Sequence, residues 1–61
     1  MGSVKKILVI EDEQDIQTLL EYNLSQAGFE VIQSENGEEG LWLAIERRPD
    51  LILLDLSLIH I

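Results

Sequence analysis

Two apolar runs in this chain each end in acidic residues. Residues 7–10 are aliphatic throughout and lead into three consecutive acids, and residues 51–54 are aliphatic throughout and lead into Asp55. Continuous aliphatic runs of this length are typical of strands buried on both faces, as in the middle of a parallel sheet. Open α/β sheets bind ligands beyond the carboxyl ends of their strands. We therefore expect Glu11, Asp12 and Asp55 to converge if the two strands are neighbours.

The segment after the first run has the periodicity of an amphipathic helix. Its apolar side chains recur at helical spacing over residues 14–27: Ile16, Leu19, Leu20, Leu24 and Ala27. Gly28 follows where a helix end favours a left-handed residue, and Asp12 or a neighbour can cap the first turn. Residues 29–33 are short and partly alternating, which predicts a more exposed strand.

Residues 37–47 predict a second helix, with Asn36 as its N-cap and Pro49 ending it before a strand at residues 50–55. Its expected inward stripe consists of three apolar residues, Leu41, Ala44 and Ile45. Trp42 and Leu43 fall on or near the expected solvent face. Single apolar residues are common on such a face, and a partner contact is the alternative.

The element order is therefore β-α-β-α-β, an α/β fold with one helix between each pair of strands. Right-handed crossovers then require a parallel sheet with helices on its faces. Strand orders 2-1-3 and 1-2-3 both satisfy this rule. We expect 2-1-3, with the helices on opposite faces, because only this order brings the ends of the first and third strands side by side.

Composition limits the kind of protein. Residues 1–61 can form one small domain, which at this size buries only about 60% of its unfolded surface. Twelve acids against four bases give a net charge of −8, which argues against direct binding of nucleic acid and favours a cation. The absence of cysteine is compatible with a reducing cytoplasm, and no long apolar segment indicates a membrane span.

The acidic residues differ in how readily a structural role explains them. Glu13 and Asp15 are most simply first-turn acids that interact with the helix dipole. Glu11, Asp12 and Asp55 would repel one another if they converge, and a hard divalent cation removes that cost. Mg²⁺ prefers oxygen ligands of this kind, so the acids predict a Mg²⁺ site that awaits an anionic ligand such as phosphate.

Several motifs, in this order and at this spacing, resemble the first half of a response-regulator receiver domain, which has a flavodoxin-like fold. They are ILVIEDE at residues 7–13, NGEE at residues 36–39 and PDLILLDL at residues 49–56. With YNL at residues 22–24 and GFEVI at residues 28–32, the likeness is to receivers of the winged-helix DNA-binding subfamily.

The resemblance implies a role for each site residue. Asp55 would be the phosphoacceptor that attacks the phosphohistidine of a sensor histidine kinase. Glu11, Asp12 and Asp55 would hold Mg²⁺, together with the backbone carbonyl of Ser57. The parent protein would act as a switch in a two-component relay in the cytoplasm, and it would contact DNA only through a separate effector domain.

The chain also departs from the receiver pattern. A receiver has five strands, and its fourth and fifth strands supply a hydroxyl residue and a lysine that contact the phosphoryl group. The chain gives only three predicted strands, so we expect a truncated receiver that is inactive alone. In the 2-1-3 order the third strand lies at the edge of the sheet, so we also expect an open apolar edge at residues 51–54 and self-association through it.

The last five residues depart from the pattern as well. The family usually continues after Leu56 with an apolar residue, Leu, Pro and Gly, whereas this chain reads SLIHI at residues 57–61. TCT-CTT-ATA-CAC-ATC encodes that sequence and resembles a transposase mosaic end, so we expect residues 57–61 to be a non-native tail. An extended strand with alternating Leu58 and His60 is the alternative. In either case, no motif elsewhere in the sequence indicates that His60 is a catalytic or metal-binding residue.

Two other functions are compatible with the sequence. The first is a small binding module that self-associates through an exposed third strand and does no phosphotransfer chemistry. The second is an aspartate-nucleophile phosphatase of the haloacid dehalogenase type, whose nucleophile lies in an Asp-x-Asp element after the first strand. That position here reads Glu11-Asp12-Glu13, which disfavours this enzyme class.

Overall fold

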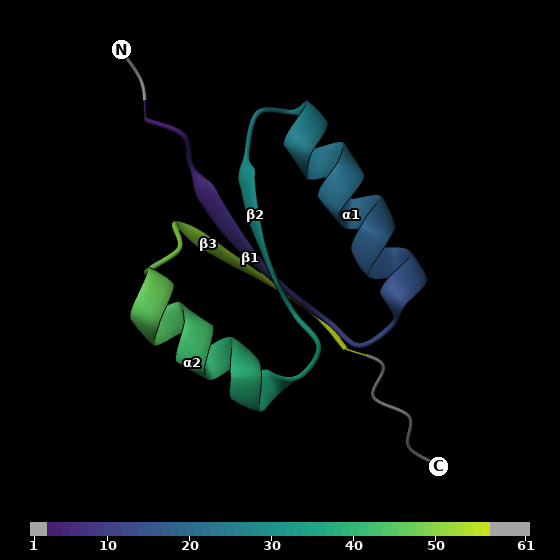
Figure 1. Ribbon diagram of the computed structural model, residues 1–61, viewed down its shortest axis with the longest axis vertical. Helices are drawn as coiled ribbons and strands as arrows, with labels where there is room; N and C mark the ends of the chain where they lie inside the picture. The colour runs from purple at the N-terminus through teal and green to yellow at the C-terminus, as the bar shows by residue number, and fades with distance from the viewer. Residues whose placement is uncertain (1–2, 57–61) are drawn as a thin grey trace.

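The computed structural model describes residues 3–56, which form a β-α-β-α-β unit (Figure 1). The elements follow one another as β1 (Lys6–Glu11), α1 (Gln14–Gln26), β2 (Glu30–Ser34), α2 (Gly37–Arg47) and β3 (Leu51–Asp55). The predicted elements are all present, with boundaries that differ by one residue at most. No helix in this part of the chain is long and apolar enough to cross a membrane.

The sheet is parallel and has the strand order β2-β1-β3, so the predicted order is confirmed. β1 lies in the centre, and α1 and α2 lie on opposite sides of the sheet (Figure 1). In the register between β1 and β3, Ile7 pairs with Leu51 and Glu11 pairs with Asp55. The order and register together place the last residues of these two strands next to each other.

The core is built on β1, whose residues 7–10 are all buried. Leu8 and Ile10 form a cluster with Ile32 of β2, and Leu43 and Ala44 of α2 pack against it. This confirms that β1 is covered on both faces. β3 has a similar composition but lies at the edge of the sheet, and Leu51, Ile52 and Leu54 are exposed. The expected open apolar edge is therefore present.

α1 ends in a Schellman motif centred on Gly28. The Phe29 N–H donates to the Leu24 carbonyl and the Gly28 N–H donates to the Ser25 carbonyl, each over 3.0 Å. Gly28 has a φ of 97°, a conformation that glycine adopts without a steric cost. The left-handed glycine predicted at this position is confirmed.

The start of α1 differs from the prediction. Glu13 occupies the N-cap position, and its side chain makes no capping hydrogen bond. The Glu13 N–H instead donates to the carboxylate of Glu11, 2.8 Å away. Leu19, counted in the apolar stripe of α1, is exposed.

α2 begins as predicted, because the side chain of Asn36 accepts a hydrogen bond of 2.8 Å from the Glu39 N–H. Glu39 reaches back and accepts hydrogen bonds from the Glu35 N–H and the Ser34 hydroxyl. This arrangement resembles a capping box in which the glutamate accepts from the residue before the N-cap, and it ties the helix start to the end of β2.

The predicted inward stripe of α2 is wrong at two of its three positions. Ala44 packs against the core, but Leu41 and Ile45 are exposed, and Leu43 packs inward in their place. The cause is Gly40, which is buried against Ile10 and therefore turns the face containing Gly40, Leu43 and Ala44 toward the sheet. Leu41 and Ile45 each follow a residue of this face, so they lie about 100° further around the helix and point away from the sheet. The solvent exposure expected for Trp42 is confirmed.

Candidate functional site

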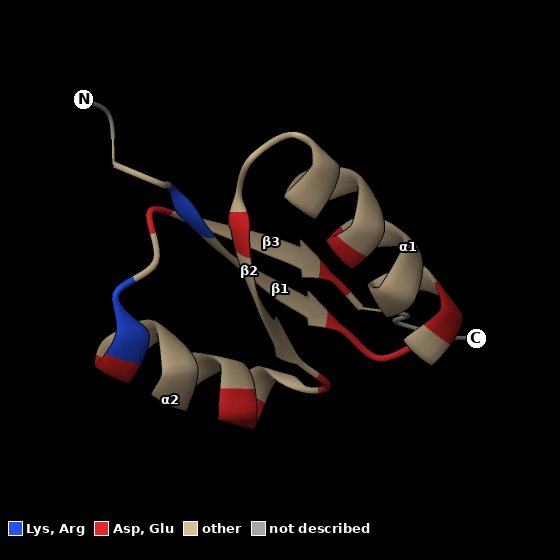
Figure 2. Ribbon diagram, turned by 45° about the horizontal axis from the view of Figure 1, so that its top comes forward, with Lys and Arg blue, Asp and Glu red and all other residues tan. Residues whose placement is uncertain are grey.

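Acidic residues lie at the carboxyl ends of β1 and β3, and we call this side of the sheet its carboxyl edge. Figure 2 shows them at the end of β1, in the turn that follows it and at the end of β3. Glu11 and Asp55 are register partners on adjacent strands, and Asp12 follows Glu11 directly. Asp12 and Asp55 are exposed, whereas Glu11 is only 1% exposed. The edge thus combines one buried carboxyl group with two accessible ones.

The two carboxyl oxygens of Glu11 have different surroundings. Oε2 accepts the hydrogen bond from the Glu13 N–H over 2.8 Å. Oε1 is buried and has no hydrogen-bond partner among residues 3–56. A buried polar atom without a partner is costly. Oε1 is therefore suited to accept a proton or to bind a cation.

The pKa of Glu11 reflects these surroundings. The hydrogen bond from the Glu13 N–H lowers the pKa, but burial and the neighbouring carboxyl groups of Asp12 and Asp55 raise it, and the net change is upward from its ordinary value of 4.5. Asp55 acts partly through its charge, so the repulsion expected among these acids is present between Glu11 and Asp55. A bound cation would reverse it, since a positive charge favours the ionised carboxylate.

The donor set has the chemistry that a hard cation requires. Within residues 3–56, no three His, Cys, Asp or Glu side chains form a group that could hold a metal ion. Mg²⁺ does not require such a group, because it keeps several waters and binds through one or two carboxylates plus a phosphate. The unpaired Glu11 oxygen beside Asp55 meets that requirement. Ser57, whose carbonyl was expected to be a further ligand, lies outside the described residues.

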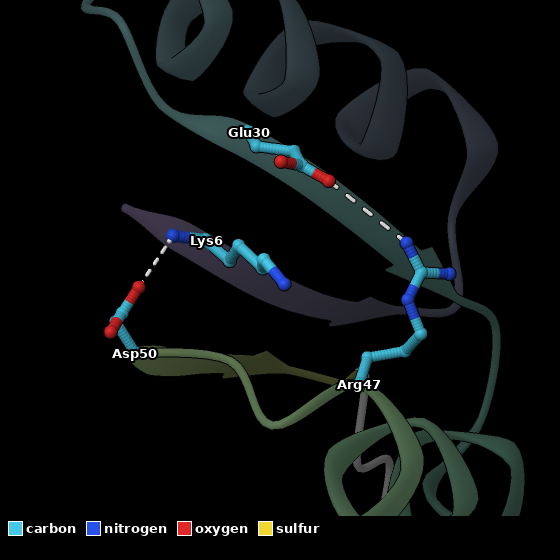
Figure 3. Close-up of polar contacts among 4 residues, drawn as sticks. All are labelled: Lys6, Glu30, Arg47 and Asp50. Carbon is cyan, nitrogen blue, oxygen red and sulfur yellow. Dashed lines mark hydrogen bonds and ion pairs between the residues drawn. The ribbon is translucent and has the colours of Figure 1, made fainter. Parts of the chain in front are cut away.

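Contacts at the amino ends of β1 and β3 fix the register that pairs Glu11 with Asp55 (Figure 3). The Lys6 N–H donates to the Asp50 carboxylate over 2.7 Å, and the Asp50 N–H donates to the Lys6 carbonyl over 2.8 Å. These two bonds align the start of β3 with the start of β1. The Arg47–Glu30 ion pair shown nearby is 3.9 Å long and half-exposed, so it contributes less than about 1 kcal/mol.

Sequence reasoning missed Gln17, a glutamine of α1 that is only 9% exposed. Its side-chain amide donates to the carbonyl of Glu11 over 3.1 Å and to the carbonyl of Ser34 over 3.2 Å. The sequence contains a signal for the burial of Gln17, because Gln17, Leu20 and Leu24 have the spacing of one helix face. A polar residue on the inward face needs a buried partner.

Comparison with known proteins places the chain in a family. Residues 7–61 match the model of the response regulator receiver domain. The chain is 54% identical over 54 residues to the alkaline phosphatase synthesis transcriptional regulatory protein PhoP of Bacillus subtilis, covering 88% of this chain and 22% of that protein. It is 48% identical over 52 residues to the transcriptional regulatory protein AfsQ1 of Streptomyces coelicolor, covering 85% of this chain and 23% of the relative.

A third relative is the DNA-binding dual master transcriptional regulator RpaA of Synechocystis. The identity is 45% over 53 residues, which covers 87% of this chain and 22% of the relative. The chain thus spans about a fifth of the length of these curated relatives. No solved structure gives a significant match. The family match and the β2-β1-β3 parallel sheet agree, and the chain belongs to the response regulator receiver domain family.

Proposed function

We propose that Asp55 is the phosphoacceptor of a two-component response regulator and takes its phosphoryl group from the phosphohistidine of a sensor histidine kinase. The observation that carries this proposal is the pairing of exposed Asp55 with buried Glu11 at the carboxyl edge of the sheet. An exposed carboxylate is accessible to the active site of a partner protein. The adjacent Glu11 supplies the second oxygen ligand that a phosphate-binding cation needs.

The cation would be Mg²⁺. No three of the described side chains form a ready metal-binding group, so Glu11, Asp12 and Asp55 would hold it partly through water, together with the backbone carbonyl of Ser57. The fit rests on Glu11 Oε1, which has no hydrogen-bond partner among the described residues, and on the all-oxygen donor set. When bound, Mg²⁺ neutralises the negative charge that develops on the phosphoryl oxygens. The main contribution of the acids is then to orient and balance charge around Asp55.

In the transfer itself, a carboxylate oxygen of Asp55 attacks the phosphorus in line with the histidine nitrogen. The new O–P bond forms as the P–N bond breaks, and the imidazole leaves with the bonding electron pair and takes up a proton. Such reactions depend mainly on positioning and charge neutralisation. The described residues contain three strands, so they lack the fourth-strand hydroxyl and fifth-strand lysine of a receiver. We expect the 61-residue chain alone to accept phosphate poorly or not at all.

The parent protein would work as a cytoplasmic switch and not as an enzyme with its own substrate. The relatives are named as transcriptional regulators, and the chain spans about a fifth of their length. A separate effector domain would therefore contact DNA. With a net charge of −8, the chain itself is poorly suited to bind the phosphate backbone.

A chimera tests the phosphoacceptor role. Residues 1–56 are fused to the remainder of the receiver domain of the Bacillus subtilis relative, and the product is incubated with acetyl phosphate and Mg²⁺. We expect a mass increase of one phosphoryl group that is lost in Asp55→Asn and in EDTA. The 61-residue chain should show little or no increase. No gain by a folded chimera would refute the role of Asp55, and efficient Asp55-dependent gain by the short chain would refute the need for the remaining strands.

A self-associating binding module is the second candidate function, and the exposed edge of β3 favours it. Leu51, Ile52 and Leu54 are exposed, and β3 has no hydrogen-bonded neighbour on its outer side among residues 3–56. Open edges of this kind pair readily with another strand. Pairing two β3 strands across a two-fold axis would satisfy both edges and bury apolar surface from each chain.

Matched lysine substitutions test this association. Leu54 on β3 and Leu41 on α2 are both 63% exposed, so Leu54→Lys and Leu41→Lys change charge and exposed surface alike. We expect the wild type and Leu41→Lys to sediment as a dimer or larger species at micromolar concentration, and Leu54→Lys to dissociate. A compact wild-type monomer with strongly protected amides at residues 51–54 would contradict the proposal.

A further inference from the structure

We propose that Gln17 is a positioning residue for the acidic site, because it fixes the end of β1 from which Glu11 and Asp12 project. This inference rests on the proposed Mg²⁺-dependent function of those acids. Gln17 does not act through their carboxylates. It acts through the main chain, by hydrogen bonds to the carbonyl groups at the ends of two strands.

The amide of Gln17 matches its surroundings in number and type. Glu11 is the last residue of β1 and Ser34 is the last residue of β2. Both carbonyls lie within hydrogen-bond distance of Nε2, at 3.1 and 3.2 Å. A carbonyl can only accept, and a primary amide nitrogen has two N–H groups. The two donors of Gln17 are therefore both used to hold the carboxyl ends of β1 and β2 together.

This arrangement immobilises the turn that carries the acids. The carbonyl of Glu11 belongs to the peptide unit that joins it to Asp12, so the bond to Gln17 fixes the plane of that unit. The Glu11 carboxylate is fixed in turn by the Glu13 N–H. The Gln17 N–H also donates to the carbonyl of Glu13, over 2.9 Å. Three hydrogen bonds thus hold residues 11–13, while Glu11 Oε1 remains without a hydrogen bond in the described chain.

Gln33 provides a matched control within the same layer. Its side-chain amide donates to the carbonyl of Gln17 over 3.3 Å and to the Glu21 carboxylate over 3.1 Å. Gln33 therefore links β2 to α1 as Gln17 does, but neither of these two hydrogen bonds reaches the end of β1. A substitution of Gln33 tests the general attachment of α1, and a substitution of Gln17 also tests the position of Glu11.

The experiment compares Gln17→Met and Gln33→Met with the wild-type 61-residue chain. Methionine keeps the length of the side chain and removes the N–H donors. The first measurement, in EDTA, is the ratio of amide exchange rates at Glu13 and Val9. We expect this ratio to rise at least about tenfold in Gln17→Met only, since Glu13 N–H protection depends on the fixed Glu11 carboxylate. General destabilisation would raise the exchange rates of both amides and leave their ratio unchanged.

The second measurement is Mg²⁺ affinity by calorimetric titration. Residues that orient a metal ligand typically change affinity by about 10–100-fold when mutated. We expect weakening in that range for Gln17→Met and less than about threefold for Gln33→Met. If Gln17→Met does not fold, Gln17→Asn replaces it, because the shorter side chain keeps the amide but withdraws it from the two carbonyls.

The outcomes separate this inference from the proposed function. An unchanged exchange ratio together with wild-type Mg²⁺ affinity in the Gln17 variant would overturn the positioning role. Equal effects of the Gln17 and Gln33 substitutions would also overturn it, because they would show only general attachment of α1. No saturable Mg²⁺ binding by the wild type would refute the metal site, and the exchange ratio would still decide whether Gln17 fixes residues 11–13.

Discussion

Replacing Gly40 by alanine should destabilise the chain although alanine is the better helix former. A Cβ atom added at Gly40 would lie 2.8 Å from Cγ1 of Ile10, would also overlap Cδ1 of the same side chain, and would lie 3.5 Å from the Ser34 hydroxyl. Favourable contacts between carbon atoms begin at about 3.5 Å, so the Cγ1 contact is too short by about 0.7 Å. Ile10 is buried in the cluster with Leu8 and Ile32, and it cannot move aside without disturbing them.

Two opposing effects determine how much Gly40→Ala changes the free energy of unfolding. Overpacking a well-packed core costs about 1–3 kcal/mol. Replacing glycine by alanine inside a helix contributes about 1 kcal/mol in the favourable direction. Gly37 of α2 is a useful control, because an added Cβ there meets nothing within 4 Å. Gly37 is the first residue of α2 and gains less helix propensity than Gly40, which offsets part of the overlap cost, so we expect Gly40→Ala to be less stable than Gly37→Ala by about 1–2 kcal/mol.

Urea unfolding of both variants at one protein concentration measures this difference, provided the slope of the transition is unchanged. A second substitution identifies the cause. Ile10→Val removes Cδ1, so Gly40→Ala should cost at least about 0.5 kcal/mol less in the Ile10→Val background than in the wild type. If Gly40→Ala is as stable as Gly37→Ala, α2 can move away from β1 freely, and the close approach at Gly40 does not determine its orientation.

Two further predictions concern the acidic edge. Mg²⁺ at about 100 times its dissociation constant should stabilise the chain by about 2.7 kcal/mol, and Asp12→Ala should abolish this effect. An equal rise in melting temperature in the variant would show that the cation only screens surface charge. In EDTA, Glu11 should lower stability as the pH rises from 4.5 through its raised pKa, because over that range the folded chain binds more protons than the unfolded chain. Glu11→Gln should flatten this part of the stability curve and be more stable than the wild type at about pH 7, and parallel curves would contradict the assigned pKa direction.

Much of the fold could be predicted because strong local signals agreed with one another. The run at residues 7–10 indicated a strand covered on both faces, and Gly28 and Asn36 marked a helix end and a helix start. Two connections of helix length between parallel strands then limited the strand order to 2-1-3 or 1-2-3. The β2-β1-β3 order followed from the acids at the ends of β1 and β3, so the adjacency of Glu11 and Asp55 could be predicted with it.

The parts that could not be predicted depend on residues whose roles are decided by packing. The stripe expected on α2 counted apolar side chains and gave no weight to Gly40, although the absence of a side chain there sets the closest approach of α2 to β1. Gln17 was overlooked for a related reason. A glutamine is counted as a surface residue unless two carbonyl groups are known to lie within its reach, and they come from strands far apart in the sequence.

The acidic edge shows how a small sheet can hold two like charges side by side. Glu11 and Asp55 repel each other, and this pair alone would favour a shifted register. The register is instead set at the opposite end, where Lys6 and Asp50 exchange two hydrogen bonds, and by the apolar pairs between them. Each backbone hydrogen bond contributes about 1 kcal/mol net, and a shift of one residue would turn the side chains of β3 to the opposite face. The residues that fold the sheet therefore hold the carboxylates together, and the remaining repulsion is what a cation would relieve.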